Sequence, residues 1–380
     1  MPFRLTCIRF YLVRLYQCLR LFFQPTTQHR NRTSPPSNTR QRTWQTQRHS
    51  VGHHTRNLIL LLGLSVAGTT FADDLITIRF SHAVANKTPK GLMALRFKEL
   101  AEARLPGQVR VKIYPRSLMY KDSNVATAIS AGKVELAAPA LSKLKSFTRK
   151  LQLFDLPFLF PDMTAVDQFQ ASPEGSALLY SMEQHNIVGL GYLHNGMKQL
   201  SGNYPIKTPA DIAGKTYRVM NSSVLQAQFK AAGAIPVVKA FPDVYNLLAI
   251  GKIDGQENTW SNIYTSHFYR VQSHVAETNH GVLDYMVITS PTFWNGLPQP
   301  IRTVLETCIQ EAIEYGNQVA TTQGRRNRTA ILATGMTKVS TPSATQRQQW
   351  ISTMKPVWNQ FSEEIGEELI RAALLAGQSR

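Results

Sequence analysis

The chain has 380 residues, of which 43% are hydrophobic and 17% charged, with 22 Gly, 20 Pro and three Cys. This length allows two lobes that each have a core, and the composition excludes collagen, a coiled coil and wholesale disorder. The formal net charge of +18 is uneven, because residues 1–72 contain ten Arg and no acidic residue. The other 308 residues carry 32 basic and 24 acidic side chains, a net charge of +8, so we expect no nucleic-acid partner.

The N-terminal segment carries an export signal. Arg56 precedes a 14-residue apolar run at residues 58–71, which is followed by Ala72 and two Asp. We predict a secretory signal peptide at residues 51–72, with cleavage after Ala72 and export to the periplasm. The run is shorter than the roughly 20 residues of a membrane span, so we expect no membrane anchor. Residues 1–50 have no coherent apolar period, and we interpret them as an untranslated or non-native extension.

The chain after Ala72 begins with a strand, a helix and a second strand. Apolar and polar residues alternate at residues 75–80 and 109–113, which predicts the two strands. Between them, Pro89 begins an apolar pattern of helical spacing that ends before Pro106. This unit favours an α/β fold with largely parallel sheets, helices on both faces and right-handed crossovers.

Two later segments resemble each other. Residues 126–136 and 245–255 both run from an apolar helix into Gly-Lys, a β-branched residue and an acid, which predicts helix, turn and strand in each. An internal duplication would explain the pair, but a Gly-terminated helix before a strand is also common by chance. The chain changes in composition around Gly196, where we place the first crossing between two lobes.

The C-terminal part predicts a strand at residues 284–289 and a long helix from Gln299 to about Thr321, which we expect to brace both lobes. Residues 346–376 form a final amphipathic segment with apolar residues three and four apart. Cys308 is the single Cys after Ala72, so an internal disulfide there is impossible, and we expect a buried structural thiol.

Signatures of catalysis, cofactors and metals are missing from the sequence. We find no G-x-S-x-G, H-E-x-x-H, C-x-x-C or complete dinucleotide fingerprint, and Gly214-Lys215-Thr216 lacks the upstream Gly of a phosphate loop. The His residues show no metal-ligand spacing. We therefore predict no catalytic residues, no metal and no cofactor.

Arg218 is the first candidate binding residue. It lies in a short predicted strand, residues 216–219, directly before a helix N-terminus. A planar guanidinium on a rigid strand edge suits two-point recognition of a carboxylate. An Arg on the solvent face of the strand would give the same pattern.

A second candidate cluster is DGQENTWSN at residues 254–262, which combines amides, a carboxylate and a Trp in a Gly-led loop. Amides can orient ligand oxygens, and Trp260 can form the wall beside an apolar carbon skeleton. A capped turn with a packing Trp would look the same. Asp254 and Glu257 are weak candidates for an acid and base pair.

These segments also resemble a known family, the DctP-type substrate-binding proteins of tripartite ATP-independent periplasmic (TRAP) transporters. The resemblance covers nearly all of residues 75–376. Its motifs are IRFSH at 78–82, TPKG at 88–91, LAAP at 136–139, FDLPFLF at 154–160, GYLHNGMKQ at 191–199, YRVM at 217–220, DGQENTWSN at 254–262 and TNHG at 278–281. Lys87, Pro242 and the stretch Asn221-Ser222-Ser223 depart from the usual pattern.

The resemblance implies a two-lobed periplasmic receptor that closes on an organic acid. Each lobe would hold a mostly parallel sheet flanked by helices, as in a type II-like binding protein, with residues 73–195 and 284–323 in lobe I and residues 196–283 and 324–380 in lobe II. In the family, the residue matching Arg218 pairs with the ligand carboxylate, Asn258 supports it, and Lys198 and Phe241 line the cleft.

The four-carbon dicarboxylate subgroup is the nearest by resemblance. It supplies four candidates for the first lobe's side of the pocket, which are His82, Lys90, Ser142 and Lys143. The expected site also includes Trp260, Asn221 and Tyr285.

The resemblance implies a monomer that delivers succinate, malate or fumarate to a small DctQ-type and a large DctM-type membrane subunit. A receptor for a 2-oxo or aromatic monocarboxylate stays open, because Arg218 accounts for one carboxylate only. An exported enzyme using His280, Glu257 and Asp254 is a further alternative, although no activated nucleophile is visible.

Overall fold

The structure, a computed structural model, describes residues 75–378. The predicted signal peptide, its cleavage site and the N-terminal extension lie outside the described residues. Within residues 75–378, no helix is both long enough and apolar enough to cross a membrane.

The first sheet has five strands in the order β2-β1-β3-β10-β4. Its strands are β1 (Ile76–Ser81), β2 (Val109–Tyr114), β3 (Leu136–Ala137), β4 (Val188–Met197) and β10 (Val282–Thr289). β1 pairs in parallel with β2 and β3, whereas β10 is antiparallel to both β3 and β4. The predicted strands at the start of the chain are confirmed, and β10 is the one strand of this sheet that runs against the others.

The second sheet has six strands in the order β11-β9-β5-β8-β6-β7. Its strands are β5 (Gln199–Gly202), β6 (Thr216–Val219), β7 (Ile235–Val238), β8 (Gly255–Asn258), β9 (His274–Ala276) and β11 (Lys338–Ser340). β5 is antiparallel to its neighbours β8 and β9, and the remaining pairs are parallel. Each sheet is therefore mixed but mostly parallel in strand direction, as the sequence predicts.

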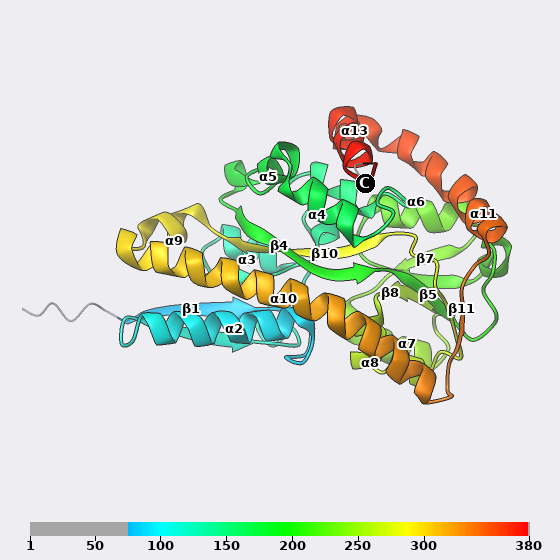
Figure 1. The fold of residues 1–380 in the computed structure, drawn as a ribbon, viewed down its shortest axis with the longest axis horizontal. Coiled ribbons are helices and arrows are strands. Elements are labelled where there is room, and N and C mark those ends of the chain that lie inside the picture. The colour runs from blue at the N-terminus through cyan, green and yellow to red at the C-terminus, as the bar shows by residue number, and fades with distance from the viewer. Residues whose placement is uncertain (1–74, 379–380) are drawn as a thin grey trace, which may run out of the picture. The chain divides into compact units, whose positions relative to one another are not determined.

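Helices flank both sheets (Figure 1). The α-helices are α2 (Pro89–Arg104), α3 (Val125–Ser130), α4 (Met163–Ala171), α5 (Pro173–Leu178), α6 (Ser223–Ala231), α7 (Val244–Ala249), α8 (Trp260–Thr265), α9 (Pro291–Gly296), α10 (Gln299–Ala333), α11 (Ala344–Met354), α12 (Ser362–Ile365) and α13 (Glu367–Ala376). The 3₁₀ turns are η2 (Leu141–Lys143), η3 (Lys150–Asp155), η4 (Glu183–His185), η5 (Pro209–Ile212), η6 (Phe241–Asp243), η7 (Phe268–Arg270) and η8 (Lys355–Gln360).

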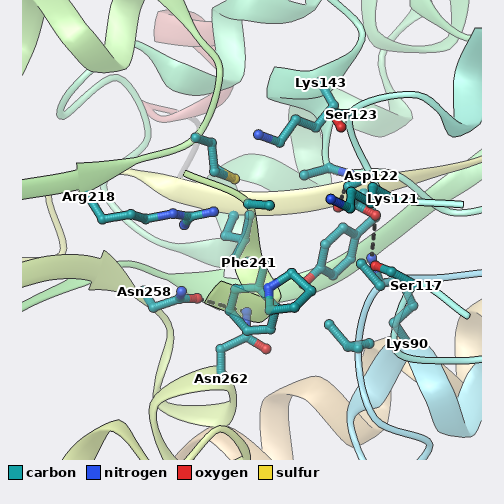
Figure 2. A pocket seen from close by; sticks show the side chains of 18 residues that line it. Lys90, Ser117, Lys121, Asp122, Ser123, Lys143, Arg218, Phe241, Asn258 and Asn262 are labelled. Carbon is teal, nitrogen blue, oxygen red and sulfur yellow. Dashed lines mark hydrogen bonds and ion pairs between the residues drawn. The ribbon is translucent and has the colours of Figure 1, made fainter. Parts of the chain in front are cut away.

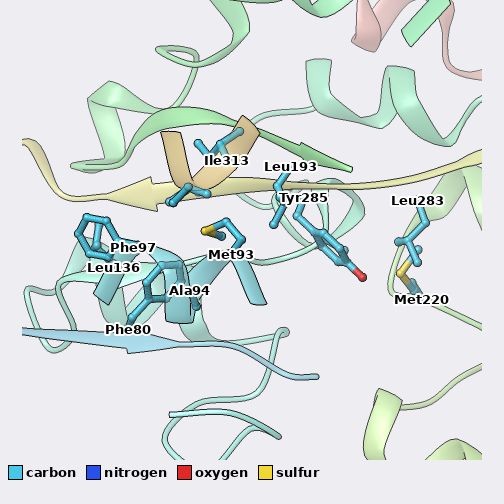
Figure 3. Packing of buried hydrophobic residues seen from close by; sticks show 14 of the residues in the cluster. Phe80, Met93, Ala94, Phe97, Leu136, Leu193, Met220, Leu283, Tyr285 and Ile313 are labelled. Atoms are coloured by element: carbon cyan, nitrogen blue, oxygen red, sulfur yellow. The ribbon is translucent and has the colours of Figure 1, made fainter. Parts of the chain in front are cut away.

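α2 begins where the sequence predicts, at Pro89. The Thr88 side chain accepts a hydrogen bond from the Gly91 N–H. Pro89 suits the first helical position because it has no N–H that would be left unpaired there. Its buried face packs Met93 and Phe97 beside Phe80 of β1 and Leu193 of β4 (Figure 3). This packing fixes the N-terminal turn of α2, and with it Lys90, next to the first sheet.

α10 is longer than predicted, because it continues from Gln299 past Thr321 to Ala333. Gly324 and the paired Thr residues have low helix propensity, but Asn327 and Ile331 are buried and Arg328 pairs with Glu277, so tertiary contacts override propensity. The helix contacts α2 and β4 beside the first sheet and α8 beside the second, and Figure 1 shows its course between them. The expected long helix that braces both halves is confirmed.

The two similar segments form the same local structure. Gly132 after α3 and Gly251 after α7 have φ of 67° and 66°, and the following Lys133 and Lys252 donate to Ala128 and Leu247 carbonyl oxygens at 2.8 and 2.9 Å. Glycine suits this turn because a Cβ would be strained at positive φ. Each turn leads into a short strand, β3 or β8, as predicted.

The chain passes between the sheets next to Lys198 and Gly281. Lys198 separates β4 from β5, Gly281 directly precedes β10, and the Lys198 N–H donates to the Gly281 carbonyl at 2.8 Å. Gly196, with φ of 123°, lies just before the first crossing. The two crossings are thus hydrogen-bonded to each other.

The C-terminal amphipathic segment is divided into short helices. Pro356 cannot continue α11, and Gly366 at φ 105° separates α12 from α13. α11 contacts α6 beside the second sheet, whereas α13 contacts α4 beside the first. The Trp358 Nε1–H donates to the Pro157 carbonyl at 3.0 Å, which holds this segment in place.

Candidate functional site

A small cavity, called the inner cavity, lies where elements of both sheets meet. Its volume is about 40 Å³, more than a single water needs. It is lined by Ala83, Val84, Lys90, Ser117, Lys121, Asp122, Ser123, Ala140, Lys143, Arg218, Met220, Ala240, Phe241, Pro242, Asn258, Asn262, Leu283 and Tyr285. Most of these residues follow β1, β2, β3, β6 or β8, and ligands of open α/β sheets bind at such carboxyl ends of strands.

Arg218 in β6 is 2% exposed and points into the inner cavity (Figure 2). Its Nε–H donates to the Lys239 carbonyl at 3.0 Å, and its guanidinium carbon lies 6.0 Å from the centre of the Phe241 ring. Burial lowers the pKa of Arg218 to about 10, although Glu257, Asp122 and Asp243 act against this. One edge of the guanidinium is therefore fixed by the backbone, and its terminal nitrogens are available to a ligand.

Lys90, in the first turn of α2, enters the cavity from the other side. It is 1% exposed, and its Nζ donates to the Ala138 carbonyl at 2.8 Å. The same nitrogen lies 3.6 Å from the centre of the Tyr285 ring and 3.9 Å from Asp122 Oδ1. Burial lowers the pKa of Lys90 to about 8, and Asp122 opposes that shift.

Lys143 of η2 is the third inward cation (Figure 2). Burial lowers its pKa to about 8, and the positive charge of Arg218 lowers it further. Arg218, Lys90 and Lys143 therefore face one cavity in which Asp122 is the single lining carboxylate among residues 75–378, and the exposed Lys121 also lines it. Such an arrangement favours a bound anion, because desolvated cations lack compensation until an anion supplies it.

Amide groups form a second part of the site. The Asn262 Nδ2 group donates to Asn258 Oδ1 at 2.7 Å, and the Thr259 N–H donates to the same oxygen at 3.1 Å. These bonds orient Asn258 so that its NH2 group is the free donor beside Arg218. Across the cavity, the Asn195 Nδ2 group donates to the Tyr285 hydroxyl at 2.6 Å, which fixes the aromatic ring under Lys90.

Six of the predicted site residues line the inner cavity. They are Arg218, Asn258, Phe241, Lys90, Lys143 and Tyr285. The structure places the other five elsewhere. Ser142 lies just behind the wall, with its Oγ 3.4 Å from the sulfur of Met220, and Asn221 is exposed beside the start of α6.

His82, Trp260 and Lys198 are buried outside the cavity lining. Burial, followed by the charge of Lys90, lowers the pKa of His82 to about 3, so its imidazole is neutral. Trp260 begins α8 and packs in the core with Val244 and Phe268, with the guanidinium of Arg328 5.9 Å from its ring centre.

Residues 80–364 match the family described as "Bacterial extracellular solute-binding protein, family 7", DctP. The chain belongs to this family. Its members are solute-binding proteins, in agreement with the prediction that the chain is not an enzyme. No group of three or more His, Cys, Asp or Glu in residues 75–378 is arranged to hold a metal ion.

Relatives of this DctP-family chain include C4-dicarboxylate-binding periplasmic proteins. The C4-dicarboxylate-binding periplasmic protein DctP of Shewanella loihica is 52% identical over 301 residues, which cover 79% of this chain and 90% of the relative. The protein of the same name from Vibrio cholerae is 44% identical, with 80% and 91% covered.

Solved structures give the same assignment of fold. A TRAP periplasmic solute-binding protein from Shewanella oneidensis with bound succinate has a TM-score of 0.79 and 51% identity, covering 80% of this chain and 99% of that chain. One from Pseudomonas aeruginosa with bound L-malate has a TM-score of 0.73 and 42% identity, covering 75% and 99%. The predicted two-sheet receptor architecture and the resemblance to TRAP receptors are confirmed.

Ser117 and Lys121–Ser123 are cavity residues of this DctP-family chain that the sequence analysis missed. They follow β2, the edge strand that is parallel to β1. The signal was available, because the segment after a strand of a parallel sheet lies at the ligand edge and Asp-Ser-Asn at residues 122–124 is turn-like.

A buried charge network surrounds the crossing between the sheets. Lys198 Nζ lies 2.9 Å from Glu257 Oε2, and His280 Nε2 lies 2.9 Å from the same oxygen. Although burial alone would raise it, Lys198 and His280 lower the pKa of Glu257 to about 2. A Cβ on Gly281 would lie 2.9 Å from Lys198 Cε, so glycine leaves room for the lysine. Lys198 thus joins β4, β8 and the segment before β10.

Proposed function

We propose that this protein is a receptor that binds a four-carbon dicarboxylate such as succinate, malate or fumarate in the inner cavity. The proposal rests on the convergence of Arg218, Lys90 and Lys143 on one small cavity, which Asp122 alone of the acidic residues in the described part of the chain lines. Arg218 comes from the second sheet, whereas Lys90 and Lys143 adjoin the first. A dianion can therefore contact both halves of the molecule at once.

In this proposal, Arg218 and the NH2 group of Asn258 bind one carboxylate, and Lys90 and Lys143 bind the other. Charge-assisted hydrogen bonds from both sides offset the cost of removing water from the dianion. Phe241 and Tyr285 flank the carbon skeleton. The names and bound ligands of the relatives support the same ligand class.

The receptor would act in the periplasm after removal of the signal peptide at Ala72. It would function as a monomer and deliver the acid to small DctQ-type and large DctM-type membrane subunits. Membership of an extracellular solute-binding family supports this role.

We also infer that the molecule consists of two hinged lobes, residues 73–195 with 284–323 and residues 196–283 with 324–380. Crossings at Lys198 and Gly281 support such a hinge, because few segments connect the sheets there. A ligand that contacts both lobes stabilises the closed form through its differential affinity for it.

A receptor for a monocarboxylate, 2-oxo or aromatic, is the second candidate. The single strand Arg would suffice for such a ligand, but the two inward lysines would then lack a partner. Measuring which acids bind therefore discriminates a dicarboxylate receptor from a monocarboxylate receptor.

The test is a thermal-shift series on protein stripped of ligand by unfolding and refolding. We expect succinate, malate and fumarate to raise the melting temperature by several degrees, since ligand at about 100 times Kd adds about 2.7 kcal/mol. Pyruvate, 2-oxoglutarate and benzoate serve as comparison acids. A shift with monocarboxylates alone would replace the proposal by the second candidate.

A further inference from the structure

A second hollow, called the outer groove, adjoins the inner cavity. Its volume is about 220 Å³, and it shares Ala83, Val84, Phe241 and Pro242 with the inner cavity. Arg116, after β2, lines it from the first-sheet side, and residues 265–268 line it from the second-sheet side. The wall between the two spaces is thus made by four side chains.

Basic groups gather at the outer groove from both sides. Arg116 and His267 line it. Burial lowers the pKa of the His267 imidazole, and the nearby charges of Arg270, Lys87 and Arg116 lower it further. No lining residue of the groove within residues 75–378 is acidic. In the same part of the chain, no carboxylate forms an ion pair with Arg116, His267, Arg270 or Lys87.

The two lining basic residues are held in an uncommon backbone conformation. Arg116 has φ of 53° and His267 has φ of 59°, both in the left-handed region that non-glycine residues seldom adopt. Backbone hydrogen bonds stabilise this conformation at both residues. The Arg116 N–H donates to the Val84 carbonyl at 3.0 Å, and the His267 N–H donates to the Tyr264 carbonyl at 3.0 Å. The backbone thus fixes the Arg116 guanidinium on one side of the groove and the His267 imidazole on the other.

An unused polar atom lies at the same place. His267 Nδ1 is buried and has no hydrogen-bond partner in the structure. A buried nitrogen without a partner loses hydrogen-bond energy, which a ligand oxygen or a water can restore. The groove therefore combines excess positive charge with spare hydrogen-bonding capacity.

We propose that the outer groove is a second anion site, which holds one carboxylate of the incoming ligand beside Arg116 and His267 before the ligand enters the inner cavity. Lys87 and Arg270 widen the positive field at this entrance. Like charges on the two sides repel one another, and an anion between them relieves that repulsion. The inference rests on the proposed function, because it takes the carboxylate ligand of the inner cavity as its occupant.

The site acts on the rate of association. A cleft lined by charges of one sign raises the local concentration of an oppositely charged ligand and speeds its capture by tenfold or more. That effect weakens with salt, because the Debye length shrinks from about 30 Å at 0.01 M to about 8 Å at 0.15 M. Arg218, Lys90 and Lys143 would still determine how long the ligand stays.

The test is stopped-flow mixing with succinate, on protein secreted from the full chain and stripped of ligand, at ionic strengths from about 0.01 to 0.3 M. We expect Lys87→Gln with Arg116→Gln to lower the association rate constant about tenfold at the lowest salt and to flatten its salt dependence. The dissociation rate constant should change less than twofold. His267→Asn, which tolerates the left-handed conformation, should lower association by a smaller factor.

The matched control is Arg110→Gln with Lys133→Gln. It removes the same charge from exposed residues of the first-sheet side that do not line either hollow. An association rate that falls equally in both double variants, or in neither, would overturn the outer site alone. No binding of any four-carbon diacid by the unmodified protein would overturn the receptor proposal, and the outer site with it.

Discussion

The individual side chains of the inner cavity are held in a state that an anion would improve. Lys90 is 1% exposed and Arg218 is 2% exposed, and burial lowers the pKa of both side chains. Lys143 is shifted in the same direction by burial and by Arg218. Burial of these like charges is therefore unfavourable in the free protein, and a bound dianion would offset part of that free energy.

Replacing Arg218 tests the role of the strand guanidinium. We expect Arg218→Ala to weaken succinate binding by at least about tenfold, since a charge-assisted pair to the ligand carboxylate is lost. Titration calorimetry measures the affinity, and a thermal melt without ligand checks the fold. Arg110→Ala, at an exposed position of β2, is the control for loss of an Arg. Unchanged affinity in Arg218→Ala would contradict the assigned role.

The affinity for the diacid should depend on pH through the two lysines. The pKa values of Lys90 and Lys143 are both lowered to about 8 in the free protein, and a bound dianion raises them because it stabilises the charged forms. We therefore expect affinity to be nearly constant below pH 7 and to fall as pH rises through 8.

Calorimetry from pH 6 to 9.5 measures this dependence. Lys143→Arg, whose guanidinium stays charged throughout this range, should make the decline less steep. An affinity that is independent of pH up to 9.5 would show that these lysines do not pair with the ligand.

At the scale of elements, charged side chains connect segments that are distant in sequence. His194 of β4 lies 2.7 Å from Asp284 of β10 through Nδ1, and its Nε2 pairs with Asp167 of α4. The His194 backbone N–H also donates to Asn317 Oδ1 of α10 at 2.8 Å. This residue thus ties a strand pair to two helices that pack in different hydrophobic clusters, α4 in one and α10 in the other.

Substitution of His194 should destabilise the fold without touching the ligand site. Burial opposes protonation, but Asp284 and Asp167 raise the pKa of His194 to about 10. Since this is above the ordinary value of 6.5, the stabilisation is full below pH 6.5 and is lost as pH rises through about 10. We expect His194→Gln to lower the free energy of unfolding by about 3 kcal/mol at pH 6, because it leaves buried Asp284 uncompensated.

Denaturant unfolding at pH 6 and pH 10.5 measures this effect. Asp167→Asn, at the exposed partner, should cost about 1 kcal/mol or less. Equal stability of His194→Gln and the unmodified protein at pH 6 would contradict the assigned role of the imidazolium.

At the scale of the whole molecule, alternation and helical periodicity were enough to predict the strand–helix–strand start, the paired helix–turn–strand segments and the long helix. The end of α10 was not predictable, because burial of Ile331 and the Arg328–Glu277 pair arise only after distant segments meet. Local propensity at Thr321 and Gly324 pointed to an earlier end.

Site residues were predictable where a single segment contains the groups that would bind the ligand. They were harder to predict where several loops converge. Arg218 and Asn258 stand out within their own short segments. Asp122 and Ser117 line the cavity because β1 and β2 lie side by side. The sequence predicts this pairing of strands, but it gives no sign that these two residues contact a ligand. Lys198 looked like a cleft residue, but the structure pairs it with Glu257 at the crossing.

In the proposed receptor, both carboxylates of one ligand are bound, one by each half of the molecule. The most direct measurement is calorimetric titration of ligand-stripped protein with succinate and with monomethyl succinate, which has a similar carbon skeleton and one charge fewer. We expect succinate to bind at least about tenfold more tightly, since the ester cannot pair with the inward lysines. Equal affinities for the two compounds would contradict two-sided recognition of a dicarboxylate.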